Sequence, residues 1–277
     1  MLRAVKQAHA RGLRVLLVPH LWVESGGWRA EIDPGTDEGW RRFAESYRAY
    51  VLSWARFAAG SHVDMLAVGV ELRSWLTTTR APSFLPILRD IRSAYPGLLT
   101  YAANWDDVDQ TVILGALDVI GINAFYPLTD KPNASDQELV AGGAEVAKKV
   151  QQLAELWQKP VLFNEFGYTA RTDPALRPWE WPDHMNGVTV DARAQAAAYR
   201  GLLSGMLGSR QLVGGFVWRL YADPDDLSQE AEWGFSPRGR QAELCLRDAF
   251  WSSWASDGPN SGRGSLFRER AETPGVF

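Results

Sequence analysis

The chain has 277 residues, a formal net charge of -4 and 46% hydrophobic residues. The length fits a single α/β barrel of about 250 residues. The net negative charge does not indicate a basic surface that would bind nucleic acid. No apolar run approaches the roughly 18 residues that a membrane span requires, and the single cysteine, Cys245, excludes an internal disulfide.

Tryptophan is the unusual component, with 13 copies. Many tryptophans can simply build a bulky core, but the flat indole face also stacks on the apolar C–H groups of a sugar ring. Carbohydrate is therefore the first substrate class that the composition suggests.

The first predicted elements are a helix, a strand and a second, longer helix. Apolar residues recur at helical spacing over 1–10, and the apolar run 13–20 reads as a strand that ends at His20. The stretch 24–28 contains too many turn formers for a strand, and the periodicity of 37–59 predicts a long helix.

The next strand, 65–70, is apolar throughout and is followed by an acid, Glu71. A helix is predicted at 82–94, and the strand 98–103 then leads to Asn104. Parallel strands that are buried on both faces read as continuous apolar runs, so a carboxylate at such a strand end needs a reason.

A short helix at 108–114 precedes the fourth strand, 117–123, and a helix at 137–157 follows. The fifth strand starts at Val161 and leads to a second strand-end acid, Glu165, before the sharp turn that Gly167 allows.

The last part of the chain contains a long loop at 172–186, a helix at 191–207, a strand at 212–218 and a helix at 241–251. Loops of that length in a compact domain are usually functional or disordered. Residues 1–251 are expected to form one domain, and 252–277, rich in Ser, Gly, Asp and Arg, a disordered tail.

Strand and helix signals alternate six times without a hairpin signature, which predicts a parallel sheet wound with helices. No Gly-rich dinucleotide fingerprint or P-loop is present, so a doubly wound nucleotide-binding fold loses support. The strand ends are instead typical of a barrel rim, with these residues: His20, Glu71, Asn104, Asn123, Glu165 and Trp218.

Four features together resemble a clan A (β/α)8 TIM-barrel glycoside hydrolase: strand-end Glu71, the segment Asn164–Tyr168, Trp218 and the segment Trp233–Gly239. Within the clan the chain is most similar to family 113, whose characterised members are β-mannanases. The resemblance covers residues 1–251 and implies that the fourth strand ends in the acid/base and the seventh in the nucleophile.

That resemblance assigns Glu71 as general acid/base and Glu165 as nucleophile. The strand count then leaves the first strand, first helix and second strand of the barrel outside this chain, and we expect them to be encoded upstream. One position departs from the pattern: most of the clan has Asn directly before the acid/base, and here it is Val70. Asn104 or Asn123 could replace its contact with the sugar 2-hydroxyl.

Glycoside hydrolysis explains why two carboxylates are needed. One must donate a proton to the departing oxygen while the other attacks the anomeric carbon. A carboxyl separation of about 5–5.5 Å gives retention of configuration and about 6.5–9.5 Å gives inversion. The resemblance implies retention.

The remaining rim residues are candidates for sugar binding. His20 and Trp22 could bind a sugar hydroxyl and stack on a sugar ring. Tyr126 could hydrogen-bond the nucleophile, and the Trp218 indole could form the base of a sugar-binding subsite. Trp105 and other tryptophans could extend the cleft. The ordinary alternatives are a structural histidine for His20 and packing roles for the aromatic residues.

The leading hypothesis is thus an endo-β-1,4-mannanase acting on an oligo- or polysaccharide, with no metal and no cofactor, as a monomer. Scattered histidines without ligand spacing favour this reading over a metal hydrolase. A hydrolase of the same clan acting on glucan or xylan is one alternative. A carbohydrate-binding or scaffold barrel without catalysis is another, favoured by Val70 and the missing strands. Glu71 could also be a salt-bridged acid at a helix start.

Overall fold

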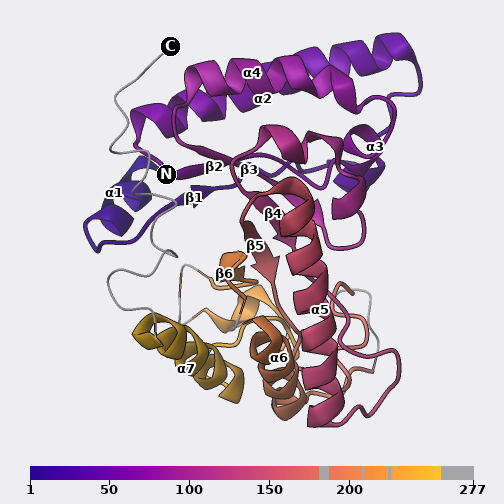
Figure 1. Ribbon diagram of the computed structural model, residues 1–277, viewed down its shortest axis with the longest axis vertical. Coiled ribbons are helices and arrows are strands. Elements are labelled where there is room, and N and C mark those ends of the chain that lie inside the picture. Colours follow the sequence, from indigo (N-terminus) through magenta and orange to yellow (C-terminus); the bar gives the residue numbers. More distant parts are fainter. Residues whose placement is uncertain (181–186, 207–208, 222, 224–225, 257–277) are drawn as a thin grey trace. The chain divides into compact units, whose positions relative to one another are not determined.

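The computed structural model describes residues 1–180, 187–206, 209–221, 223 and 226–256 (Figure 1). The chain divides into two compact units. Unit 1 comprises Met1–Asn123 and Trp157–Leu162, and unit 2 comprises Ala124–Leu156 and Phe163–Phe277.

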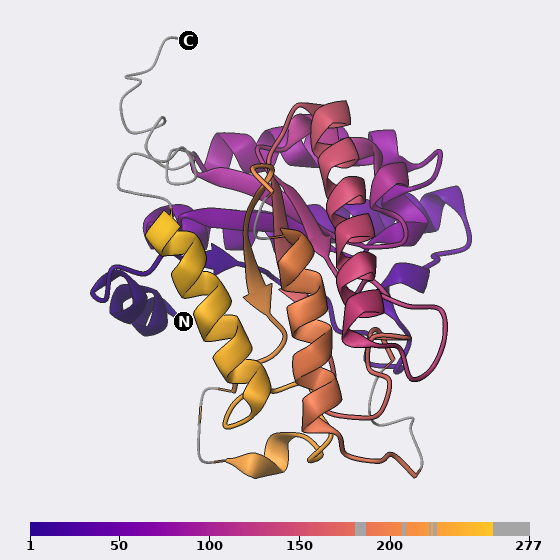
Figure 2. The same ribbon diagram turned by 60° about the horizontal axis from the view of Figure 1, so that its bottom comes forward.

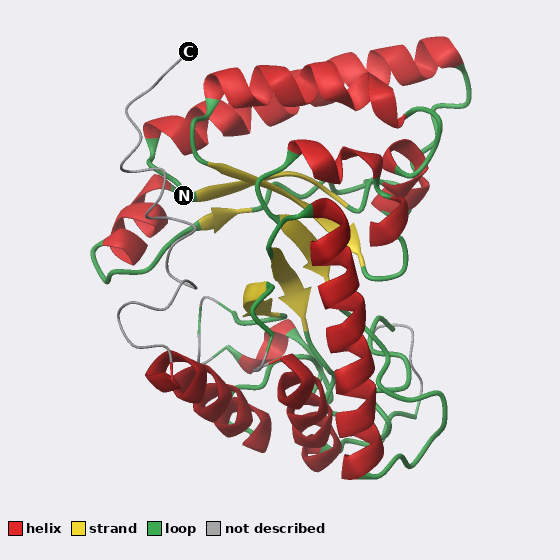
Figure 3. Ribbon diagram, viewed as in Figure 1, coloured by secondary structure: helices red, strands yellow, loops and turns green. Residues whose placement is uncertain are grey.

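Strands and helices alternate along the chain (Figure 3). The strands hydrogen-bond to one another in chain order and are β1 (Leu16–Leu17), β2 (Met65–Val70), β3 (Leu98–Asn104), β4 (Ile120–Asn123), β5 (Val161–Phe166) and β6 (Leu212–Val217). The pairs β1–β2, β2–β3 and β3–β4 are parallel. Carboxyl ends of parallel neighbours lie at one edge, so the loops after β1 to β4 meet there.

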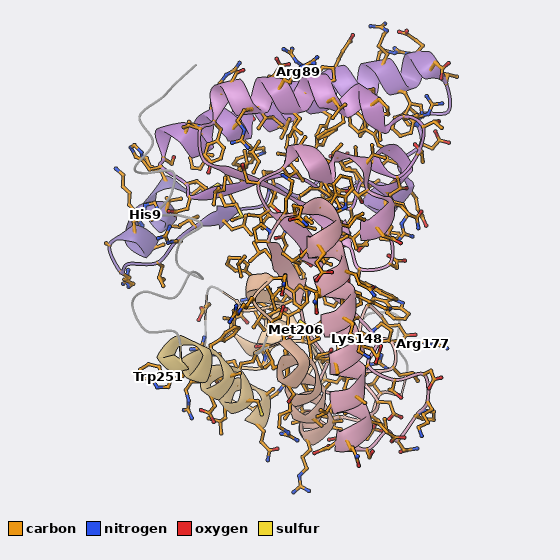
Figure 4. The ribbon with its side chains drawn as sticks, viewed as in Figure 1. His9, Arg89, Lys148, Arg177, Met206 and Trp251 are labelled. Carbon is orange, nitrogen blue, oxygen red and sulfur yellow. The ribbon has the colours of Figure 1, made fainter. Side chains whose placement is uncertain are left out.

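The α-helices of unit 1 are α1 (Leu2–His9), α2 (Asp37–Gly60), α3 (Arg73–Leu76) and α4 (Leu85–Ala94). Thr36 caps α2 by accepting the Gly39 N–H at its side chain, and α2 lies beside α4 (Figure 1). His9, labelled in Figure 4, lies 3.0 Å from Asp64 and ties α1 to the chain just before β2.

The core of unit 1 holds the end of β2 in place. All residues of β2 and β3 are buried. Tyr47 of α2 packs edge-on against Trp75, with ring centroids 5.5 Å apart, and its hydroxyl donates to Val68 O at 2.8 Å. A Cβ at Gly69 would lie 2.8 Å from that hydroxyl, so only glycine admits this contact. The strand that leads to Glu71 is therefore fixed on both faces.

Unit 2 contains α5 (Asp136–Trp157), α6 (Ala192–Met206) and α7 (Gln241–Ser256). Helices α6 and α7 lie side by side, as Figures 1 and 2 show. Helices α5 and α6 approach each other closely through glycines, since a Cβ at Gly143 would lie 2.0 Å from Gly201 O.

The predicted elements are present, with differences in extent and type. The helix expected at 82–94 begins as a 3-10 helix, Ala81–Phe84, and the strand expected at 117–123 begins at Ile120. The strand expected at 13–20 is only two residues long, because within the described part of the chain β1 pairs with β2 on one side and Pro19 cannot donate to a ladder. The helix expected at 108–114 is a pair of 3-10 helices, Val108–Gln110 and Val112–Ala116. Cys245 is half-buried.

Helix α7 extends to Ser256, and 257–277 of the expected tail lie outside the described residues, as do 181–186 of the long loop. None of the helices in the described part of the chain combines the length and hydropathy that a bilayer crossing requires.

The α5–α6 contact yields a test of the fold. Gly143→Ala should lower the free energy of unfolding by about 1–3 kcal/mol, because the added methyl would clash with the backbone carbonyl of Gly201, which cannot change rotamer as a side chain could. Gly60→Ala is the matched control: its Cβ has no neighbour within 4 Å, and it should be neutral or stabilising by about 0.5–1 kcal/mol. Urea unfolding measures both, and equal stability of Gly143→Ala and wild type would rule out this packing.

Candidate active site

Glu71 leaves strand β2 in an unusual backbone conformation. Its φ is +50°, in the left-handed region, where a non-glycine residue costs of order 1–3 kcal/mol. Two hydrogen bonds hold it: Glu71 N donates to Ala102 O at 2.9 Å, and Leu72 N donates to the Tyr101 hydroxyl at 2.6 Å. Such strain often accompanies a functional role, and here it turns the chain from β2 into α3.

The Glu71 carboxylate accepts three hydrogen bonds. Oε2 accepts from Trp28 Nε1 at 2.9 Å and from Arg29 Nη1 at 2.7 Å, while Oε1 accepts from Asn123 Nδ2 at 2.9 Å. The side chains of Arg29 and Glu71 are only 15% and 12% exposed. Segments after β1, at the end of β2 and at the end of β4 thus meet at one carboxylate.

Arg29 uses two further donors within the same loop. Its Nε donates to Leu21 O at 3.2 Å, and its Nη2 lies 3.1 Å from His20 Nδ1. A guanidinium can only donate, so Nδ1 of His20 is the acceptor and a neutral imidazole carries its proton on Nε2. Partial burial and the Arg29 cation lower the pKa of His20, and the Glu71 carboxylate opposes this shift.

Arg73 supports the indole that donates to Glu71. Its guanidinium lies 5.1 Å from the Trp28 ring centre and pairs with Asp106 at 2.5 Å and with Asp107 at 2.6 Å. Burial raises the pKa of Asp107, and the hydrogen bond from Arg73 opposes that rise. Arg73 therefore connects the loop after β3 with Trp28.

In unit 2, Glu165 is the half-buried fifth residue of β5, and its carbonyl accepts from Ala124 N at 2.6 Å. Trp218 follows β6 and donates its backbone N–H to Phe166 O at 2.8 Å. A Cβ at Gly167 would lie 2.3 Å from Trp218 O, so glycine is required directly after the strand that carries Glu165.

After Trp218, the residues Arg219, Tyr221 and Glu230 contact one another. Arg219 lies 3.6 Å from Glu230 and 4.7 Å from the Tyr221 ring centre. Tyr221 donates its hydroxyl to Glu230 at 3.0 Å, and burial followed by the Glu230 interactions raises the pKa of Tyr221 to about 12.

The candidate sugar-binding residues occupy different environments. Asn123 donates a hydrogen bond to Glu71 directly, whereas His20 is linked to Glu71 through Arg29. Trp22 is 85% exposed, whereas Tyr126 is buried with its ring 6.4 Å from Phe163. The others are buried Asn104, half-buried Trp105 and half-buried Trp218. The roles of all these residues remain predictions.

Trp28 and Arg29 were missed by sequence reasoning. Both lie in the turn-rich loop after the first strand, on the same rim as the predicted acids, and an acid at a buried strand end requires donors. That requirement could have directed attention to this loop, but no spacing rule selects which loop residue reaches Glu71. Among the described residues, no group of three or more His, Cys, Asp or Glu side chains is arranged to hold a metal.

Comparison with known proteins identifies the class. The chain resembles the family 113 β-mannanase AaManA from Alicyclobacillus acidocaldarius, in complex with ManMIm, at 23% identity and a TM-score of 0.75, over 91% of this chain and 77% of that one. It resembles a GH113 β-1,4-mannanase at 25% identity and a TM-score of 0.72, over 91% and 78%. One chain from a structural work on two fungal β-1,4-galactanases matches at 15% identity and a TM-score of 0.54, over 89% of this chain and 81% of that one. The fold is that of the α/β-barrel glycoside hydrolases.

The sequence matches the model of Glycoside Hydrolase Family 113 over residues 1–233. The chain therefore belongs to glycoside hydrolase family 113 and is a glycoside hydrolase. A comparison with curated proteins finds no match.

The backbone lock at Glu71 is testable. Tyr101→Phe removes the acceptor of the buried Leu72 N–H and should lower the free energy of unfolding by about 1–3 kcal/mol. Tyr50→Phe is the control, because the Tyr50 hydroxyl donates to His20 O at an exposed position, and it should change stability by less than about 0.5 kcal/mol. Chemical unfolding of both variants measures the two free energies of unfolding. Equal losses of stability in Tyr101→Phe and Tyr50→Phe would show that the Tyr101 hydroxyl has no special role.

The His20 environment makes stability depend on pH. The folded-state pKa of His20 lies below its ordinary value of 6.5, so the unfolded chain binds more protons in the interval just below pH 6.5. Stability therefore falls as pH drops through 6.5 toward the lowered pKa, and His20→Gln should flatten this part of the profile. Thermal unfolding from pH 5 to 8 measures it; an identical slope in the variant would contradict the assignment.

Proposed function

We propose that the chain is a retaining endo-β-1,4-mannanase in which Glu71 is the general acid/base and Glu165 the nucleophile. The observation that carries the proposal is the strand-end carboxylate of Glu71, with N–H donors on both oxygens, in a family 113 chain with a second strand-end carboxylate on β5. The relatives described as β-mannanase and β-1,4-mannanase support mannan as the substrate.

In the first step, a carboxylate oxygen of Glu165 forms a bond to the anomeric carbon as the bond to the departing oxygen breaks. That oxygen keeps the bonding pair and takes the proton of Glu71, which leaves a glycosyl ester on Glu165. Arg29 then lies beside the newly formed Glu71 carboxylate and compensates its charge.

In the second step, water attacks the anomeric carbon while Glu71 accepts its proton, and the ester bond to Glu165 breaks. Two displacements restore the original configuration. This chemistry requires both carboxyl groups to reach one glycosidic bond, so replacement of either one should stop turnover of the natural polymer.

The sugar-binding part of the proposal uses the remaining rim residues. His20 is proposed to contact a sugar hydroxyl at the rim, with its ring oriented by Arg29 at Nδ1. Trp22, at 85% exposure, offers a stacking face, and Trp105 and Trp218 offer further indole faces. Asn104 or Asn123 is proposed for the 2-hydroxyl, and Tyr126 as the partner of Glu165.

Hydrolysis of β-1,4-mannan, with β-glucan and xylan alongside, tests the function. We expect mannan to be cleaved and kcat to fall by at least about 10³-fold in both Glu71→Ala and Glu165→Ala. Glu145→Ala is a matched control on an exposed face of α5, where Glu145 pairs with Lys148 and should not affect turnover. Faster hydrolysis of glucan or xylan than of mannan would contradict mannan as the substrate and assign the faster polymer instead. A folded chain that binds mannan without cleaving it would leave a carbohydrate-binding barrel.

A further inference from the structure

We propose that Arg29, together with Trp28, is a positioning residue that keeps Oε2 of Glu71 as a hydrogen-bond acceptor and so places the acid proton on Oε1. This inference rests on the proposed role of Glu71 as acid/base. It assigns a task to two residues outside the predicted site and specifies which oxygen of the carboxyl group exchanges its proton.

The argument starts with the lone pairs of the two oxygens. A carboxyl oxygen has two lone pairs in the plane of the group. At Oε2 both are used, one by Trp28 Nε1 at 2.9 Å and one by Arg29 Nη1 at 2.7 Å. Among the described residues, Oε1 accepts one hydrogen bond, from Asn123 Nδ2 at 2.9 Å. A proton on Oε2 would have to displace an N–H donor, whereas a proton on Oε1 displaces none.

The two donors on Oε2 are themselves held. Arg29 is 15% exposed and also hydrogen-bonds to Leu21 O and His20 Nδ1, groups other than Glu71. The Trp28 indole packs under Arg73, and that guanidinium is fixed by two aspartates, Asp106 and Asp107. Neither donor can leave Oε2 without breaking contacts elsewhere.

Asn123 marks the other oxygen. It is 1% exposed, and its Oδ1 has no hydrogen-bond partner within the described part of the chain. Its Nδ2 is the donor to Oε1, so this amide is the neighbour that senses a proton arriving there or leaving. In the proposed reaction the Oε1–H bond breaks as the proton moves to the departing oxygen, and Oε1 later takes a proton from water.

Several charged or titratable groups surround Glu71 in unit 1 and could report their own titration. They are His20, Arg29, Arg73, Tyr101, Asp106 and Asp107. His20 is the group to separate, because it shares Arg29 with Glu71. Its ring ¹H–¹³C signals follow its titration independently of the N–H signals.

Two-dimensional ¹H–¹⁵N spectra across a pH titration test the proton position without requiring activity. The signals are the Trp28 indole N–H and the Asn123 side-chain amide, assigned with Trp28→Phe and Asn123→Ser. Through the titration of Glu71, the Asn123 amide should move by the larger amount while the Trp28 indole keeps its hydrogen-bonded position. Glu71→Gln should abolish both responses, which identifies their source.

Arg29→Gln should weaken the asymmetry, so that the Trp28 indole also moves. Arg92→Gln is the matched control, since Arg92 pairs with Asp118 and Gly97 O, and the wild-type pattern should persist there. A larger movement of the Trp28 indole than of the Asn123 amide in the wild type, or an unchanged pattern in Arg29→Gln, would overturn the proposal.

Kinetics provide the second readout. Acid assistance matters most for poor leaving groups, so Arg29→Gln should reduce kcat on mannooligosaccharides at least tenfold more than on a dinitrophenyl β-mannoside, and Arg29→Lys should restore part of the loss. An equal loss of kcat on both substrates in Arg29→Gln would indicate that Arg29 has a merely structural role. If Glu71→Ala itself shows no leaving-group dependence, the acid/base assignment fails, while the spectra still report where the Glu71 proton resides.

Discussion

The hydrogen bonds that hold Glu71 in the left-handed region are the constraint on which the site in unit 1 depends. Glu71 N is paired with Ala102 O and Leu72 N with the Tyr101 hydroxyl, so β3 dictates how the chain leaves β2. The buried strands on either side make this turn rigid. A strained backbone persists only where its surroundings fix it, and here they fix the residue that carries the carboxylate.

The charges around Glu71 form a continuous chain of contacts. Arg29 connects the carboxylate to His20, and Arg73 connects the Trp28 indole to two aspartates. A buried ion pair adds little net stability, but removal of one partner leaves an uncompensated charge; this applies to Arg29–Glu71, at 15% and 12% exposure, more than to the exposed Arg73–Asp106 pair. The network is therefore better understood as a means of fixing orientation than as a source of stability.

The fold and the two strand-end acids could be predicted from sequence because parallel buried strands read as apolar runs with sharp ends. Glu71 and Glu165 stand out against that background. Trp28 and Arg29 lie in a segment whose conformation depends on contacts with Glu71, directly after β2, and with Arg73 of α3, and no local pattern encodes those contacts. Likewise the two-residue length of β1 depends on how it is paired, which its apolar run does not reveal.

The assignment of roles to Glu71 and Glu165 is tested most directly by azide rescue with an activated aryl β-mannoside. In Glu71→Ala, azide should replace water in the second displacement and give the β-mannosyl azide. In Glu165→Ala, azide should enter from the opposite face in a single displacement and give the α-mannosyl azide. The same anomer from both variants, or reversed anomers, would contradict the account of one acid/base and one nucleophile.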